Sequence, residues 1–97
     1  MAPSSATADI VRVRAIQLID DRGQVRARLN VEPGGEVVFR LLDEEGTIRV
    51  KLGASEDGSR LLLLNDLTEL GVHLLTDQNG SQITLSGRDG TQQVIEP

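Results

Sequence analysis

The chain has 97 residues, of which 38% are apolar, and it carries a formal net charge of −5 with one aromatic residue and no cysteine. This length suits a single domain with a thin aliphatic core, and since disulfides are excluded, oligomerisation is the expected source of additional stability. No apolar run reaches the roughly 18 residues that a membrane-spanning helix needs.

The first nine residues, 1–9, are mostly small and polar. They lack the basic region and the apolar region of a signal peptide, and we expect them to form a flexible lead-in to a single β-repeat domain over residues 10–97. Such a start predicts a cytoplasmic protein. A cell-envelope location would follow if an N-terminal membrane anchor had been removed.

Alternating apolar and polar residues predict short β-strands throughout this domain. Ile48, Val50 and Leu52 alternate with Arg49 and Lys51, which is the period-two pattern of a half-buried strand. The strands that precede the turns are apolar on both sides instead. No window of ten residues has helical spacing, so no helix is expected. Eight strands are predicted, at 10–19, 24–31, 36–42, 47–53, 60–64, 71–76, 81–86 and 91–95.

Four of these strands run into turns at intervals of 23, 22 and 22 residues. The turns follow Ile19, Leu42, Leu64 and Ser86, and the third lacks a glycine and is expected to be about two residues longer than the others. Units this short cannot bury their own apolar faces and must stack on their neighbours. The repeat predicts an all-β antiparallel meander of four hairpin units, packed as a β-prism, a barrel or a small sandwich.

Two segments also resemble a known group of proteins. Residues 11–29, VRVRAIQLIDDRGQVRARL, and 41–53, LLDEEGTIRVKLG, are similar to a bacterial β-repeat family with leucine-aspartate-x-x-glycine-x-x-arginine units. The resemblance covers residues 10–58 well, whereas Asn65, Thr68 and Gln93 depart from the motif. It implies a β-repeat fold and, because some members carry an N-terminal membrane anchor, an envelope setting. It implies no activity.

No residue pattern indicates catalysis or a bound cofactor. Residues 77–81, DQNGS, offer calcium-type oxygen ligands, but they lack the spacing of an EF-hand, and tight turns require the same residue types. His73 has no partner within reach in the sequence, and no serine occupies a nucleophile elbow. We therefore predict a non-enzymatic protein without a catalytic, metal or cofactor site.

Basic residues two positions apart define one candidate surface. Each pair projects from one face of a sheet, and together they could bind an anionic ligand or partner; alternatively, they pair with carboxylates of the turns and adjacent strands. The single aromatic residue and the negative net charge argue against nucleic acid as that partner. The candidate residues are Arg12, Arg14, Arg26, Arg28, Arg49 and Lys51.

The strands that are apolar on both sides define a second candidate surface. One side fills the core, and the other must be covered, because large aliphatic patches are rare on soluble monomers. We expect a structural or self-assembly module that forms a homo-oligomer, either a dimer or a trimer, within a larger or anchored protein. The candidate assembly residues are Val37, Val38, Phe39, Leu61, Leu62, Leu63 and Leu64.

Overall fold

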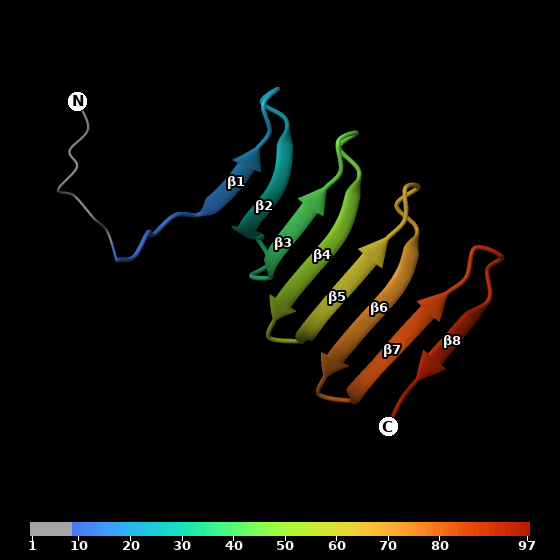
Figure 1. Ribbon diagram of the computed structural model, residues 1–97. Coiled ribbons are helices and arrows are strands. Elements are labelled where there is room, and N and C mark those ends of the chain that lie inside the picture. The colour runs from blue at the N-terminus through green and yellow to red at the C-terminus, as the bar shows by residue number, and fades with distance from the viewer. Residues whose placement is uncertain (1–8) are drawn as a thin grey trace, which may run out of the picture.

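The computed structural model describes residues 9–97, so residues 1–8 of the predicted lead-in lie outside the described residues. Eight strands form one antiparallel sheet in the order of the chain (Figure 1), which confirms the predicted all-β meander. The described residues contain no helix that could cross a membrane. The strands are β1 (Ala15–Ile19), β2 (Val25–Val31), β3 (Val37–Leu42), β4 (Ile48–Ser55), β5 (Gly58–Leu64), β6 (Leu70–Asp77), β7 (Gly80–Ser86) and β8 (Gln92–Ile95).

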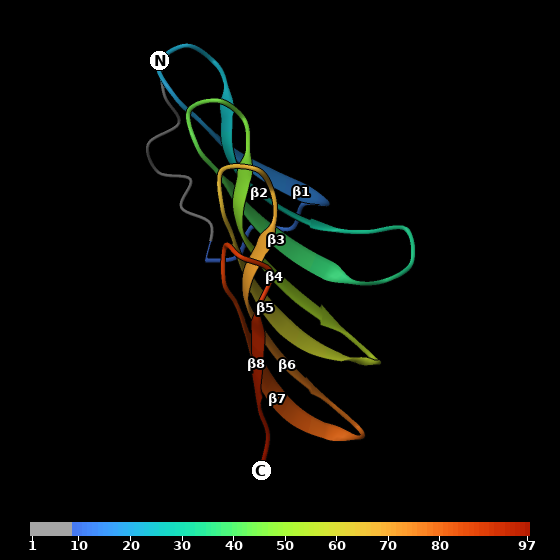
Figure 2. The same ribbon diagram turned by 90° about the vertical axis from the view of Figure 1, so that its right-hand side faces the viewer.

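The sheet is open and has a single layer. Each strand contacts only its neighbours in sequence, and the view along the sheet shows no second layer of the described chain (Figure 2). The meander prediction holds, but the expected packing of the sheet as a β-prism, a barrel or a small sandwich is not found within residues 9–97. Short hairpins lay each strand beside the previous one, and the sheet stays open because β1 pairs only with β2 and β8 only with β7.

The strand at the N-terminal edge is shorter than predicted. The sequence pattern predicts a strand over 10–19, but β1 begins at Ala15, which pairs with Asn30 one residue before β2 ends. Beyond that point the chain of β2 turns away, so residues 10–14 have no strand to pair with in their own sheet. The other seven strands lie within two residues of their predicted bounds.

Four turns at one end of the sheet share one geometry, and we call them the aspartate turns: residues 20–24, 43–47, 65–69 and 87–91. In each, the first residue donates its N–H to the carbonyl of the fifth and accepts a bond from the fourth. The fourth residue takes a positive φ, which Gly23 and Gly46 adopt without strain and Thr68 adopts at 62°. The third turn was predicted to be about two residues longer than the others, and this prediction is wrong. Thr68 occupies the position that glycine holds in the other turns, so the turn keeps the same length.

The pairing register sorts the side chains onto two different faces. Because side chains alternate along a strand, residues opposite each other in neighbouring strands share a face. One face, which we call the aliphatic face, carries no charged residue in any strand. The other, the arginine face, carries every strand arginine and the strand lysine: Arg26, Arg28, Arg40, Arg49, Lys51 and Arg60.

Candidate functional site

The aliphatic face consists of two apolar rows that cross the sheet from edge to edge. The first row contains one apolar residue from every strand: Ile16, Leu29, Phe39, Leu52, Leu61, Leu74, Ile83 and Ile95. The second contains Leu18, Ala27, Leu41, Val50, Leu63, Val72 and Leu85, and ends at Gln93. A row of this length requires every strand to keep the same phase, so the face is a consistent feature of the whole sheet.

Nothing within the described chain covers this face. Leu52 and Leu63, near its middle, remain 42% and 40% exposed, and Ile16 and Leu18 at the β1 edge are 54% and 64% exposed. Among the hydrophobic side chains of residues 9–97, only Ala27 and Val38 are buried. Toward the C-terminal edge the surface is hollowed into an open depression of about 620 Å³ that is lined by Leu61, Leu74, Ile83 and Ile95, among others.

The extent of exposure exceeds that of a compact monomer. A folded chain of 10.5 kDa has an accessible surface of about 5,400 Å², whereas this chain exposes 7631 Å². Residues 1–8 account for at most about 1,100 Å² of the difference, which is their full unfolded surface. An excess of similar size remains for the sheet itself.

The predicted assembly residues are divided between the two faces. Val37, Phe39, Leu61 and Leu63 belong to the aliphatic face, whereas Val38 and Leu62 alternate onto the arginine face; Leu64 lies at a register shift opposite Leu70. Sequence reasoning treated the run of leucines as one surface because each residue is equally apolar. The register shows which members share a side, and it adds Leu29, Leu52, Leu74 and Ile83, which the sequence prediction did not include.

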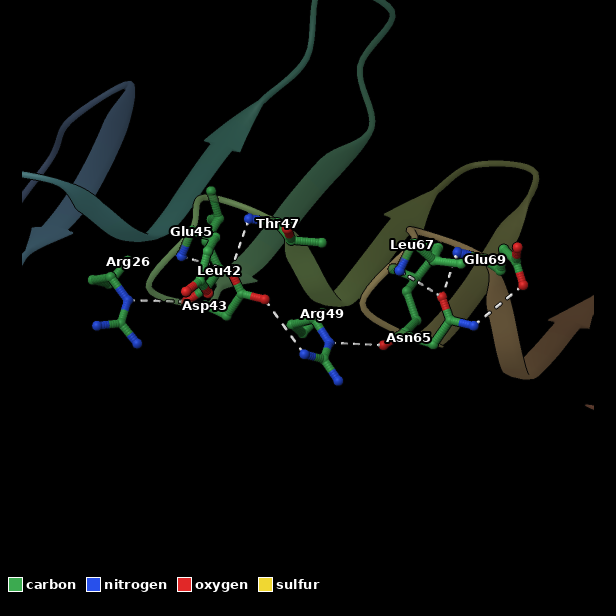
Figure 3. A network of polar contacts seen from close by, with 10 residues as sticks. Arg26, Leu42, Asp43, Glu45, Thr47, Arg49, Asn65, Leu67 and Glu69 are labelled. Carbon is green, nitrogen blue, oxygen red and sulfur yellow. Dashed lines mark hydrogen bonds and ion pairs between the residues drawn. The ribbon is translucent and has the colours of Figure 1, made fainter. Parts of the chain in front are cut away.

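On the arginine face, two arginines brace the aspartate turns. Arg49 donates from Nη1 to Asp43 Oδ2 at 3.3 Å and from Nε to the carbonyl of Leu64 at 3.1 Å (Figure 3). One hairpin earlier, Arg26 donates from Nε to the carbonyl of Leu42 at 3.0 Å, and its Nη1 forms an ion pair with Asp20 Oδ2 at 3.8 Å. The sheet register shifts at Leu42 and at Leu64, so each arginine satisfies a carbonyl beside a bulge.

Aspartate and arginine occur together in these turns and are lost together. Asp20 and Asp43 are each followed six positions later by Arg26 and Arg49, respectively. In the third turn Asn65 takes the aspartate position, with Gly71 in place of the arginine. Asn65 still accepts the N–H groups of Leu67 and Glu69 through Oδ1, just as Asp43 accepts those of Glu45 and Thr47 (Figure 3). The turn needs only the side-chain acceptor oxygen, which Asn and Asp both supply. The negative charge of the aspartate forms the ion pair with the arginine.

A second pair of ionic contacts encloses the buried Val38. Arg60 donates from Nε and Nη2 to the two carboxylate oxygens of Glu36, at 3.0 and 2.8 Å, across the intervening strand β4. The Arg60 and Glu36 side chains meet over Gly53, where an added Cβ would lie 3.0 Å from Arg60 Nε and even closer to the Glu36 carboxylate. Arg40 pairs with Glu32 on the other side of Val38. The glycine therefore makes room for a bidentate ion pair.

The predicted cationic residues are only partly brought together. Arg26, Arg28, Arg49 and Lys51 share the arginine face with Arg40 and Arg60, which the sequence prediction did not include. Arg12 and Arg14 precede β1 and belong to no strand. Four of these guanidinium groups pair with carboxylates of the same chain, namely those of Arg26, Arg40, Arg49 and Arg60.

Hydrogen bonds within the chain lower the pKa values of three carboxyl groups. The bond from Arg40 lowers the pKa of Glu32, the backbone N–H of Thr47 lowers that of Asp43, and the Thr91 side chain lowers that of Asp89. His73 lies on the arginine face between Leu62 and Thr84, and its Nε2 has no hydrogen-bond partner. Within residues 9–97, no group of three His, Cys, Asp or Glu residues is placed to hold a metal ion.

The geometry thus describes an all-β, single-layer sheet with one bare aliphatic face. No family model matches the chain, and neither a curated protein nor a solved structure does. The resemblance to bacterial leucine-aspartate repeats, and the envelope setting that it implies, therefore stay predictions.

Proposed function

We propose that this protein is a structural self-assembly module whose aliphatic face packs against the aliphatic face of a second copy. The observation that carries the proposal is the pair of uncharged rows, apolar at every position except Gln93, that cross all eight strands without a covering layer. An identical face on a second copy is complementary in chemistry, and a two-fold axis would place each row against its equivalent.

The area of the face is sufficient for such a contact. Eight strands about 4.8 Å apart and about five residues long, at about 3.3 Å per residue, give a projected area of roughly 550 Å². Side-chain relief increases the accessible area beyond this projection, toward the roughly 800 Å² per partner of a standard stable interface. Stacking would give each sheet the second layer that stable β-domains have.

The arginine face suits the outer side of this assembly. Four of its five guanidinium groups, those of Arg26, Arg40, Arg49 and Arg60, already pair with carboxylates of their own chain. Ion pairs of this partly exposed kind contribute little to stability, but they keep one side of the sheet polar. Charge on one face and its absence on the other make face-to-face pairing the favoured mode of association.

The test is the oligomeric state in solution, measured by sedimentation equilibrium or light scattering over a wide range of concentrations. The proposal expects a dimer that dissociates on dilution, and a defined oligomer of another size would refute the two-fold pairing. A chain that stays monomeric at every concentration, with its sheet intact by circular dichroism, would refute it.

One observation supports a second function, as a module that binds an anionic ligand. Arg28, Arg40 and Lys51 lie directly opposite one another in three adjacent strands, and only Arg40 of the three pairs with a carboxylate. Adjacent like charges are unfavourable unless an anion lies between them. We propose weak, salt-sensitive binding of anionic lipid vesicles that is lost when Arg28 and Lys51 are changed to Gln. Equal retention of both proteins by the vesicles would exclude this function.

A further inference from the structure

A third row of residues lies at the end of the aliphatic face opposite the aspartate turns. Side chains two positions from the first apolar row point to the same face, and the strand pairing places them opposite one another from β2 to β7. The members in β2 and β3 are large and apolar, whereas those in β5, β6 and β7 carry hydroxyl groups and are smaller. In strand order the third row contains Val31, Val37, Ala54, Ser59, Thr76 and Ser81.

This difference in size coincides with the open depression on the aliphatic face. The depression, of about 620 Å³, is lined by Ser59, Thr76 and Ser81 together with residues of the first row from β5 to β8. Thr76 Oγ1 and Ser81 Oγ lie 2.7 Å apart and hydrogen-bond to each other, so covering them leaves this pair satisfied. Over β2 and β3, by contrast, Val31 and Val37 remain 58% and 42% exposed. One half of the face is therefore hollow, and the other half carries exposed apolar bulk.

The direction of the two-fold axis decides whether these halves meet. An axis parallel to the strands keeps every residue at its own level along the strand and places β1 to β4 of one copy over β8 to β5 of the other. Val37 then lies over Thr76, and Val31 over Ser81, so large side chains cover small ones. An axis that crosses the strands between the two layers places each strand over its own equivalent, and no valine of β2 or β3 then reaches the depression.

We propose that the two copies pair about an axis parallel to their strands, so that β2 and β3 of each copy fill the depression of the other. This inference rests on the proposed function, to which it adds the orientation of the pair. Phe39, the only aromatic residue of the chain, lies in the first row on β3 and would be placed over Leu74, which lines the depression of the second copy. An aromatic side chain in a pocket of the partner is a common anchor of protein interfaces.

The absence of cysteine from the sequence allows single spin labels to measure this orientation. Gln17 on β1 and Val94 on β8 lie in one row of the arginine face, so labels there leave the apolar contact untouched. Seven strand spacings of about 4.8 Å separate the two edges, so the labels of a Gln17→Cys pair should lie roughly 35 Å apart. Mixing Gln17→Cys with Val94→Cys should add a distance of roughly 20 Å, which is the layer spacing of about 10 Å plus the reach of two side chains.

The distances separate this inference from the proposed function. The inference is overturned, and face-to-face assembly stands, if Gln17→Cys alone gives the shorter distance and the mixture adds the longer one. That result would place β1 over β1 of the partner. A wild-type chain that is strictly monomeric gives no distance between copies and refutes both.

Compensating substitutions supply a second measurement. Thr76→Phe should weaken association about tenfold or more, because the new ring would occupy the space that Val37 of the second copy fills. Adding Val37→Ala should restore most of the affinity, although the two positions are three strands, roughly 14 Å, apart within one chain. The matched control is Val31→Ala, which lies over Ser81 instead and should restore less. Equal rescue by the two alanine changes, or rescue by neither, would overturn the contact.

Discussion

Two adjacent leucines provide the sharpest test of the aliphatic face. Leu63 belongs to the second apolar row, whereas Leu62 points to the arginine face between Lys51 and His73. The two side chains have the same size, lie on the same strand and have the same propensity to form strands. A Leu63→Glu change and its control Leu62→Glu therefore differ mainly in the face on which the new carboxylate lies.

The expected size of the effect follows from exposure. Leu63 is 40% exposed, so covering it contributes about 0.6–1.2 kcal/mol of the 1.5–3 kcal/mol assigned to full burial of a leucine. A symmetric dimer of Leu63→Glu loses this contribution once in each copy. It must also bury two carboxylates, at a cost of several kcal/mol each unless they are protonated. A total of about 5 kcal/mol or more corresponds to at least a thousandfold weaker association. At position 62 the new carboxylate faces Lys51 and should leave association nearly unchanged.

Sedimentation equilibrium of the three proteins at equal concentrations measures this difference. Circular dichroism serves as the control for folding, because a variant that lost its sheet would carry no information about assembly. The reasoning is refuted if folded Leu63→Glu assembles as tightly as the wild type. It is also refuted if Leu62→Glu disrupts assembly equally, because the register would then not divide the two faces.

Three further predictions concern the stability of the sheet. Gly53→Ala should lower the free energy of unfolding by about 1–3 kcal/mol, since its Cβ would displace the Glu36–Arg60 pair. Thermal unfolding should show a smaller loss when Glu36→Ala is already present. An equal loss in both backgrounds would contradict this explanation. Thr68→Gly should raise stability by up to about 1 kcal/mol, or several degrees in Tm, because it relieves the positive φ at that position, whereas Gly46→Thr should lower Tm. Acid should destabilise the fold. The pKa values of Glu32 and Asp43 are lowered in the folded protein from their ordinary values of 4.5 and 3.8. The stability that these carboxylates contribute is therefore present above the ordinary pKa values and is lost as pH falls through the pKa values of the folded protein. Tm should thus stay level from neutral pH to about pH 5 and fall below about pH 4, with a shallower fall in Asp43→Asn; a Tm that rose with acid would exclude this assignment.

The local features of the fold could be predicted from the sequence. Alternating patterns and continuous apolar runs together identified seven strands to within two residues, and the turn residues after Ile19 and Leu42 identified the hairpins, because these signals depend on neighbouring residues. The one misplaced strand start, at β1, has a non-local cause. Residues 10–14 look like a strand, but the strand β2 that would pair with them ends at Val31.

The division of the candidate surfaces depended on registers that no local pattern contains. In a run of four leucines, 61–64, every position is equally apolar, so only the partners Leu52 and Lys51 reveal which side each leucine takes. Arg40 and Arg60 were not included because each is isolated in the sequence. Their partners become visible only when β3, β4 and β5 lie side by side. The single open layer was also not predicted, since the sequence shows that apolar faces need covering but not which chain covers them.

The arginine contacts on one face of the sheet and the bare aliphatic face on the other are related features of this fold. A single-layer sheet has no core between two layers, and here arginine side chains on one face link neighbouring strands and turns by hydrogen bonds. Arg26 and Arg49 each connect an aspartate turn to the carbonyl of the following strand pair, and Arg60 reaches across β4 to Glu36. Arginines that are occupied in this way cannot also be free for a ligand. A sheet that is braced from its polar side can keep its other side entirely apolar. That is the arrangement expected if the second layer comes from another copy of the chain.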